Sequence, residues 1–284
     1  MLLPTPRITH STAADGYRFA VRVWAAQGAA APRASVVCLH GIISHGGWYH
    51  PSCRELARAG CEVHFLDRRG SGLNRAGRGD VDRWQTWPAD VEGYLAGLPD
   101  GPPRALLGIS WGGKLAAAVA RRRPELVDAL GFLCPGLFAK KGANAVQRAA
   151  LKLAAVVGLK CLRVTVPLRD PALFTGHARW QAYVGADPLA LRKVTVRFAL
   201  ADLELTCYAT EAPEQIEPKA ALLVLAGRDR IIDNARVRRY FERLGAAERR
   251  VIEYPEATHT LEFEPDPTRY LRELRDWVGA VAGD

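Results

Sequence analysis

Short apolar runs alternate with segments of helical spacing through the first 136 residues. Runs that end in glycine or a polar residue are typical of strands, and the segments between them repeat apolar positions every three to four residues, as on one face of a helix. The runs are YRFAVRVWA (17–25), ASVVCLHG (34–41), CEVHFLDRRG (61–70), PRALLGIS (103–110) and LVDALGFLCPG (126–136). This order predicts an α/β fold, with a mostly parallel central sheet and helices on both faces.

The strand rhythm stops after residue 136 and returns near residue 214. The residues between read as helical segments without strands, and they are too many for an unstructured loop in a compact domain. Strand-like runs then resume at KAALLVLAGRDRIID (219–233) and ERRVIEYPEATH (248–259). We therefore predict one core built from residues 1–136 and 214–284, interrupted by a helical cap, or lid, of residues 137–213.

The first helix expected in this interruption, ANAVQRAALKLAAVVGL (143–159), is strongly apolar and carries Arg148 and Lys152 four residues apart. An apolar stripe is usually core, so the favoured interpretation is a helix packed on the core with both basic side chains in water. The alternative is a lip that makes transient contact with lipid or admits an acyl chain.

Composition indicates a globular protein and argues against a membrane-spanning or secreted one. With 284 residues, 49% apolar and 24% charged, the chain has globular proportions. No apolar run approaches the roughly 18 residues that span a bilayer, and the start MLLPTPRITH lacks the apolar core of a signal peptide. We expect a soluble, cytoplasmic protein whose six cysteines are reduced. No cysteine pair has CxxC spacing, and neither a metal nor an organic cofactor is implied.

The formal charge of +9 raises the question of a nucleic-acid partner. The basic residues are spread along the chain, most are arginine, and no helix-turn-helix, finger or aromatic RNA-binding signature accompanies them. We expect no nucleic-acid partner and no stable insertion into a membrane.

The candidate chemistry begins with GISWG (108–112), which places Ser110 between two glycines after a predicted strand and before a predicted helix. The pattern G-x-S-x-G in this context indicates a serine held on a sharp strand-to-helix turn, where it acts as a nucleophile. An ordinary loop serine is the alternative for the bare pattern, and the strand-helix context argues against it.

A serine nucleophile requires a base and an acid. His259 follows the last strand-like run, where a loop can bring its imidazole over the sheet. Asp229 directly follows the preceding strand and is the favoured acid, whereas Asp233 stands just before a helical segment and reads better as its N-cap.

The oxyanion of an acyl-transfer intermediate needs two preorganised donors. We predict the backbone N–H of Trp111, directly after the serine, and that of Ile42 in the loop LHGIISHGGWYH (39–50). Trp48, His45 and Phe138 are candidates for lining the substrate pocket, although aromatic residues at such positions also fill cores.

Taken together, these residues resemble the α/β-hydrolase superfamily, and within it the monoacylglycerol lipase, lysophospholipase and serine aminopeptidase-like group. The similarity rests on the HG of residues 40–41, DRRGSG (67–72), GISWGG, GRD (227–229) and the final ATH (257–259), in the order expected for the whole chain. The resemblance implies Ser110 as nucleophile, His259 as base, Asp229 as acid, and a helical cap at residues 137–213.

Departures from related groups refine the prediction. Proline iminopeptidases also place Trp after the nucleophile but usually carry HGGPG at the oxyanion loop, where this chain has HGIIS. We therefore predict a serine hydrolase that cleaves carboxylic esters with an apolar acyl group through an acyl-enzyme, as a carboxylesterase, monoacylglycerol lipase or lysophospholipase does. The alternatives are a peptidase or amidase on the same triad, and a non-catalytic hydrolase-like binding protein.

Overall fold

The computed structural model describes residues 5–28, 31–140 and 142–283. Residues 1–4, which belong to the start segment that we do not interpret as a signal peptide, lie outside this range.

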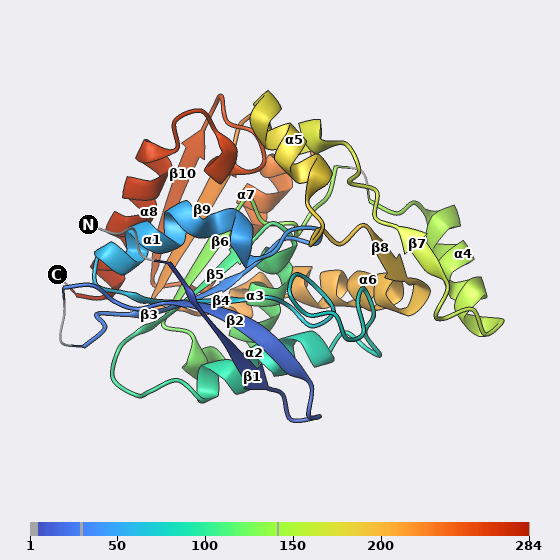
Figure 1. Cartoon of the computed structure of the whole chain (residues 1–284), viewed down its shortest axis with the longest axis horizontal. Helices are drawn as coiled ribbons and strands as arrows, with labels where there is room; N and C mark the ends of the chain where they lie inside the picture. The colour runs from blue at the N-terminus through green and yellow to red at the C-terminus, as the bar shows by residue number, and fades with distance from the viewer. Residues whose placement is uncertain (1–4, 29–30, 141, 284) are drawn as a thin grey trace.

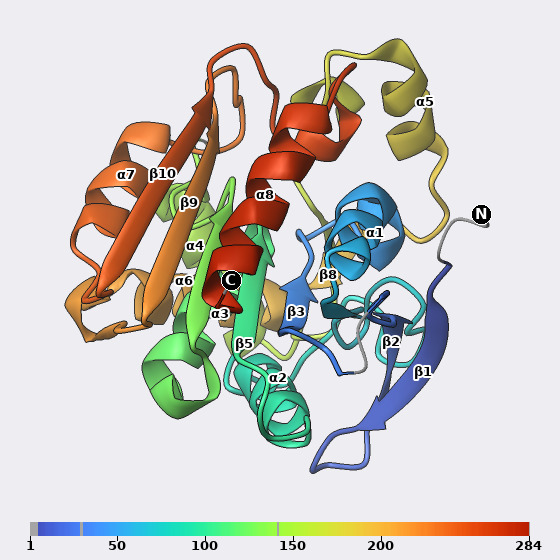
Figure 2. The same cartoon turned by 90° about the vertical axis from the view of Figure 1, so that its left-hand side faces the viewer.

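An eight-stranded sheet forms the core, in the order β1-β2-β4-β3-β5-β6-β9-β10 (Figures 1 and 2). The pairs β1·β2 and β2·β4 are antiparallel, and every pair from β4 to β10 is parallel. The strands are β1 (Arg7–Thr12), β2 (Arg18–Trp24), β3 (Ser35–Leu39), β4 (Glu62–Leu66), β5 (Arg104–Ile109), β6 (Ala129–Leu133), β9 (Ala220–Ala226) and β10 (Glu248–Tyr254). Every residue of β3 and β6 is buried, which explains their unbroken apolar runs and confirms the predicted sheet.

Helices cover both faces of the sheet. α1 (His50–Arg58) packs on α8 (Thr268–Val281) over one face, and α2 (Thr86–Ala96) packs on α3 (Trp111–Arg122) over the other (Figures 1 and 2). α7 (Asn234–Glu242) lies against β9. α8 shows why such segments fold as helices: its buried side chains recur at helical spacing and form one apolar stripe, namely Tyr270, Leu274, Trp277 and Val278.

Residues 137–213, here named the insertion, connect β6 to β9, two strands that are neighbours in the sheet. The insertion contains α4 (Ala145–Val156), α5 (Ala178–Ala186), α6 (Val196–Thr210) and the short strands β7 (Arg163–Thr165) and β8 (Lys193–Thr195). The prediction of an insertion without strands was therefore wrong, because β7 and β8 pair as an antiparallel ribbon. Short 3-10 turns complete the chain: η1 (Gly46–Tyr49), η2 (Pro124–Leu126), η3 (Pro171–Leu173), η4 (Pro213–Gln215) and η5 (Leu261–Phe263).

α4 lies at the far side of the insertion, next to α6 and away from the large sheet (Figure 1). None of its residues is buried, and Val146, Leu153 and Val156 are 77%, 64% and 83% exposed. The favoured interpretation of this segment as a helix packed on the core was wrong. Val146, Leu153 and Val156 face outward instead, and the side chains of Arg148 and Lys152 are exposed as well.

All six cysteines are free thiols, and four of them are buried. In the part of the chain that the structure describes, no helix combines the length and the apolar character needed to cross a membrane.

Candidate active site

Ser110 occupies the sharp turn between β5 and α3, with φ 51° and ψ −121°. Few residues other than glycine adopt a positive φ, so the turn must be held by its surroundings. The Ser110 amide donates to the Leu133 carbonyl at 3.0 Å, and the Ser110 carbonyl accepts from the amides of Gly113 (2.8 Å) and Gly136 (2.6 Å). These bonds fix the strained backbone from β6 and from the first turn of α3.

The two glycines around Ser110 are required by close backbone approach. A Cβ on Gly108 would lie 2.6 Å from the Gly112 carbonyl oxygen, and one on Gly112 would overlap the Leu39 carbonyl at the end of β3. The pattern G-x-S-x-G is therefore a packing requirement of the turn.

The structure brings Ser110, His259 and Asp229 together. His259 Nε2 lies 2.8 Å from Ser110 Oγ, and His259 Nδ1 lies 2.6 Å from Asp229 Oδ2. The Asp229 and His259 residues are only 1% and 5% exposed. The imidazole is thus held between a hydroxyl and a carboxylate, in the geometry by which a base activates a serine.

Asp229 is held as a carboxylate. Its Oδ1 accepts from the amides of Ile231 (2.7 Å) and Ile232 (3.1 Å). Burial alone would raise the pKa of Asp229, but the His259 charge and these hydrogen bonds together lower it below its ordinary value. Asp233 lies elsewhere: its side chain accepts from the Arg236 amide and caps α7.

The amides of Ile42 and Trp111 flank the serine. Gly41 approaches so closely that a Cβ built on it would lie 3.3 Å from Ser110 Cβ. Among the described residues, the Ile42 amide donates to no backbone carbonyl, and the Trp111 amide is the first of α3 and has no acceptor within the helix. Neither N–H group therefore has a backbone acceptor among the described residues, which is compatible with their predicted role as donors.

His40 orients the peptide that carries the Ile42 N–H. The Arg68 amide donates to His40 Nε2 at 2.9 Å, which leaves the ring proton on Nδ1, and Nδ1 donates to the Gly41 carbonyl at 2.7 Å. Burial and the nearby Arg68 guanidinium lower the pKa of His40 to about 3, so the ring stays neutral at pH 7. A hydrogen bond at the carbonyl end polarises the planar peptide and strengthens its N–H as a donor.

The loop DRRGSG (67–72) braces the same region. The fully buried Asp67 accepts from Arg22 Nη1 at 2.5 Å and from the amides of Gly46 and Leu73, both at 2.8 Å. Since Gly46 begins η1, Asp67 ties the loop after β4 to the loop after β3.

A small pocket adjoins Ser110. Trp48 lines it, and Leu168 and Phe174 of the insertion contribute to its wall, with the Phe174 ring 5.9 Å from the His259 ring. The full lining is Gly41, Ile42, Ile43, Ser44, Trp48, Tyr49, Ile109, Ser110, Leu168, Phe174, His259 and Thr260. The walls are mainly apolar, and part of them comes from an element far away in the sequence.

The other two pocket candidates lie elsewhere. Phe138 is absent from this lining, and its ring packs on Tyr240 with the Arg236 guanidinium 4.4 Å from its centroid. His45 is buried behind Trp48, where its Nδ1 accepts from the Gly47 amide at 3.0 Å.

Asp187, at the end of α5, is a residue that sequence patterns did not single out. Its Oδ2 accepts from Trp48 Nε1 at 2.6 Å and lies 3.1 Å from His45 Nε2. The Leu191 amide also donates to the Ile43 carbonyl at 3.0 Å. The insertion thus bonds directly to the loop that carries the Ile42 amide, and only a three-dimensional contact could reveal this.

Comparison with known families matches residues 30–266 to the model of the serine aminopeptidase S33 family. The chain belongs to this family. Among curated relatives, it is 28% identical to a monoacylglycerol lipase of Mycolicibacterium smegmatis over 98% of this chain and 99% of the relative. It is 27% identical to a monoglyceride lipase of Mus musculus over 99% of this chain and 94% of the relative.

Solved structures agree on the fold of this family member. A soluble variant of monoglyceride lipase from Saccharomyces cerevisiae superposes with a TM-score of 0.85 at 19% identity, covering 98% of this chain and 96% of that one. A monoacylglycerol lipase from Paleococcus ferrophilus gives 0.82 at 22% identity, covering 93% and 99%. The fold is that of the α/β-hydrolases, and the chain lies within the monoacylglycerol lipase group.

Proposed function

We propose that this protein is a serine hydrolase of carboxylic esters with an apolar acyl group, acting through an acyl-enzyme. The observation that supports this most strongly is the continuous hydrogen-bonded arrangement of Ser110, His259 and Asp229 on a strained turn. The lipases among its relatives agree with an ester as substrate.

In the proposed mechanism, Ser110 Oγ attacks the ester carbonyl while His259 Nε2 takes its proton. Asp229 stabilises the imidazolium, and the amides of Ile42 and Trp111 bind the oxyanion. His259 then protonates the leaving alcohol, and in the second half it activates a water that releases the acid.

A peptidase is the nearest alternative, given the name of the family. An aminopeptidase must bind the free ammonium group of its substrate, which favours a carboxylate close to the serine. None of the described residues that line the Ser110 pocket is aspartate or glutamate. The pocket's apolar walls, with Trp48, Leu168 and Phe174, fit an acyl group better.

The insertion, residues 137–213, acts in this proposal as a cap over a core of residues 1–136 and 214–284. Leu168 and Phe174 close one side of the pocket, so the insertion helps to select the acyl group. The exposed apolar side chains of α4, next to Arg148 and Lys152, fit transient contact with a lipid surface, because such a helix face gains from partial burial at a bilayer boundary.

Labelling with a fluorophosphonate probe tests the nucleophile. We expect wild-type protein to be labelled and Ser110→Ala not to be. Absence of labelling in the wild type, or equal labelling of the variant, would show a non-catalytic binding protein or a different nucleophile. Asp229→Asn and Asp233→Asn form a matched pair for the acid. Only the first is expected to reduce turnover, by about 10⁴-fold.

Turnover across p-nitrophenyl esters of increasing acyl length, compared with amino-acid anilides, tests the substrate class. We expect esters to be preferred and longer acyl chains to be accepted. An optimum at acetate would contradict the lipid-like acyl group while leaving an esterase, and a preference for anilides would identify a peptidase.

A further inference from the structure

Arg68 is a buried cation directly behind the candidate active site. The residue is 7% exposed, and its Nη2 donates to the Ile42 carbonyl at 3.1 Å and to Ser71 Oγ at 2.8 Å. Within the described residues, its Nε and Nη1 have no hydrogen-bond acceptor. Because an unsatisfied buried charge is costly, Arg68 calls for an explanation other than fold stability.

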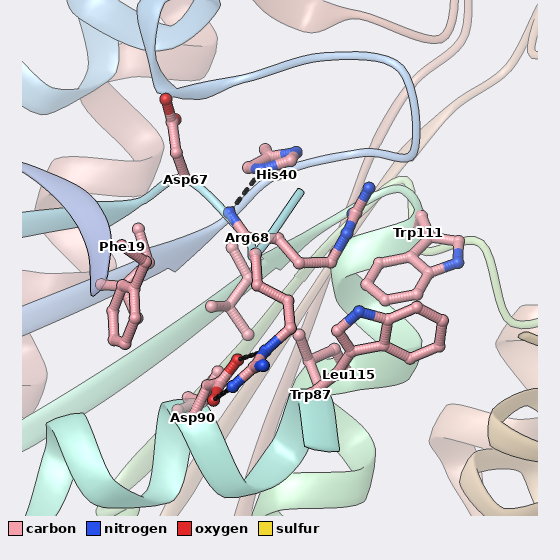
Figure 3. A pocket seen from close by; sticks show the side chains of 12 residues that line it. Phe19, His40, Asp67, Arg68, Trp87, Asp90, Trp111 and Leu115 are labelled. Atoms are coloured by element: carbon pink, nitrogen blue, oxygen red, sulfur yellow. Dashed lines mark hydrogen bonds and ion pairs between the residues drawn. The ribbon is translucent and has the colours of Figure 1, made fainter. Parts of the chain in front are cut away.

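The guanidinium stacks on the ring of Trp111. Arg68 Cζ lies 4.2 Å from the ring centroid, and Figure 3 shows the Arg68 side chain extending toward Trp111, with the Trp87 ring next to that of Trp111. The Trp87 and Trp111 rings meet edge to face at 5.0 Å, and Trp111 Nε1 donates to Asp202 at 2.6 Å. Trp111 is therefore held on several sides, and Arg68 covers one ring face.

Two carboxylates lie near enough to stabilise the charged form of Arg68, but each of them is hydrogen-bonded to a different basic side chain. Asp67 accepts from Arg22, and Asp202 accepts from Lys114 Nζ at 2.8 Å. Burial lowers the pKa of Arg68 to about 9, while these carboxylates oppose the shift. The guanidinium is thus charged at pH 7, and no carboxylate of the described residues lies within hydrogen-bond distance of it.

Arg68 also holds the main chain around Ile42, the other predicted oxyanion donor. Its guanidinium holds the carbonyl of Ile42, and its own amide fixes the His40 ring that holds the carbonyl of Gly41. The peptides on both sides of the Ile42 Cα are consequently pinned by groups of one residue, one of them through His40.

We propose that Arg68 is the positioning residue of the oxyanion hole, fixing Ile42 and Trp111 and adding an unpaired positive charge behind their two amides. This inference rests on the proposed function. A rigid pair of donors and a preorganised cation stabilise charge that develops only in the transition state, so the effect falls on kcat and less on KM. In DRRGSG, Arg68 is the first of the two arginines, and the second, Arg69, bonds to Asp90 and Asp15 instead.

Arg69 provides the matched control. It lies in the same loop but pairs with Asp90 through two bonds of 2.6 and 2.7 Å and with Asp15 at 2.8 Å. Among the described residues, none of its hydrogen bonds reaches Ile42 or Trp111. Arg69→Met should lower the melting temperature, because it leaves the largely buried Asp90 unpaired, without lowering kcat per folded site.

The experiment compares Arg68→Met, Arg68→Lys and Arg69→Met by kcat and KM on one soluble ester, by melting temperature, and by affinity for a trifluoromethyl ketone. The ketone forms a hemiketal oxyanion with the serine and so reports on the donors directly. For Arg68→Met we expect kcat to fall by roughly 10- to 100-fold, KM to stay within about threefold, and ketone affinity to fall with kcat. Arg68→Lys, which keeps the charge but not the planar fork, should lie between Met and wild type.

Three results would overturn the proposal: kcat of Arg68→Met within about threefold of wild type, an equal kcat loss in Arg69→Met, or a kcat loss without a loss of ketone affinity. If Arg68→Met does not fold, Arg68→Lys alone carries the test, with kcat and ketone affinity expected to fall together at constant KM. A wild-type protein without esterase activity would instead contradict the proposed function, so the two failures are distinguishable.

Discussion

Two helices of equal length and similar composition have opposite surroundings in this molecule. α3 and α4 are each twelve residues long and rich in alanine, yet α3 buries ten of its residues and α4 buries none. α3 packs on β5, α2 and α6, whereas α4 packs mainly on α6. Small apolar side chains permit both outcomes, because they allow close packing and also carry little cost at a surface.

The two helices also differ at their first residues. Asn144 caps α4 by accepting from the Gln147 amide at 2.9 Å, and the Gln147 side chain returns a bond to the Asn144 amide. Ser110 stands at the same position of α3 but makes no side-chain cap, and its hydroxyl faces His259 instead. One N-cap side chain bonds to its own helix, and the other bonds to a histidine instead.

The largest expected effect comes from exchanging these two cap residues for alanine. Ser110→Ala should reduce ester turnover by about 10⁴-fold or more with little change in stability. Asn144→Ala should leave turnover unchanged and cost about 1 kcal/mol of helix stability. Ester turnover and thermal unfolding are measured for both variants. A Ser110→Ala protein that retains activity would contradict the proposed catalytic role of Ser110.

The next largest effect is expected when the same alanine-to-aspartate substitution is made in each helix and stability is measured. Ala118 in α3 is fully buried and Ala149 in α4 is exposed. Ala118→Asp should destabilise the protein by about 4 kcal/mol or more, since it buries an unpaired carboxylate, whereas Ala149→Asp should stay within about 0.5 kcal/mol. Urea unfolding measures both. Equal losses would mean that α4 is buried in solution.

A buried carboxyl group in the core, Glu262, should make the stability of the protein depend on pH, whereas the exposed side chains of α4 should not. Burial raises the pKa of Glu262 to about 7, although the Ser52 hydroxyl bond opposes the shift. The folded state therefore keeps a proton that the unfolded chain loses near pH 4.5, so stability falls as pH rises from about 4.5 to about 7 and is then level.

Glu262→Gln removes this pH dependence. We expect the variant to resemble wild type at pH 5 and to be more stable at pH 8, by at most about 3 kcal/mol. Unfolding at the two pH values measures the difference, and Lys152→Gln on α4 is the surface control. A variant that loses stability equally at both pH values would show that the raised pKa is absent.

The smallest expected effect concerns the outward face of α4. Replacing Val146, Leu153 and Val156 together by serine should lower turnover of a long-chain monoacylglycerol dispersed in vesicles by about tenfold, because less apolar surface meets the lipid. Turnover of a soluble short-chain ester should not change. A parallel loss on both substrates would indicate damage to the site rather than to lipid contact.

The sequence indicated those features that depend on local backbone geometry. Ser110 and its flanking glycines could be recognised because the strained turn admits few other residues, and the parallel sheet followed from buried apolar runs. By contrast, β7 and β8 have three residues each and pair across some thirty positions, so neither carries a pattern long enough to detect.

Contacts between distant segments escaped prediction for the same reason. α4 has the periodicity of a core helix, and only its position beyond α6 leaves it exposed. Phe138 follows β6 closely in sequence, but its carbonyl accepts from the Asp233 amide and its ring packs away from the pocket. Leu168 and Phe174 reach Ser110 from the insertion, which no spacing in the chain reveals.

The bonds of Asp187 have a consequence for how the protein responds to ligands. Because one carboxylate oxygen of the insertion accepts from Trp48 and contacts His45, we expect displacement of this part of the insertion to loosen the loop that carries the Ile42 amide. In the proposed mechanism, coverage of the pocket by the insertion and placement of the Ile42 donor would then be coupled. A molecule that binds only the closed arrangement would tighten both at once, even without touching the loop.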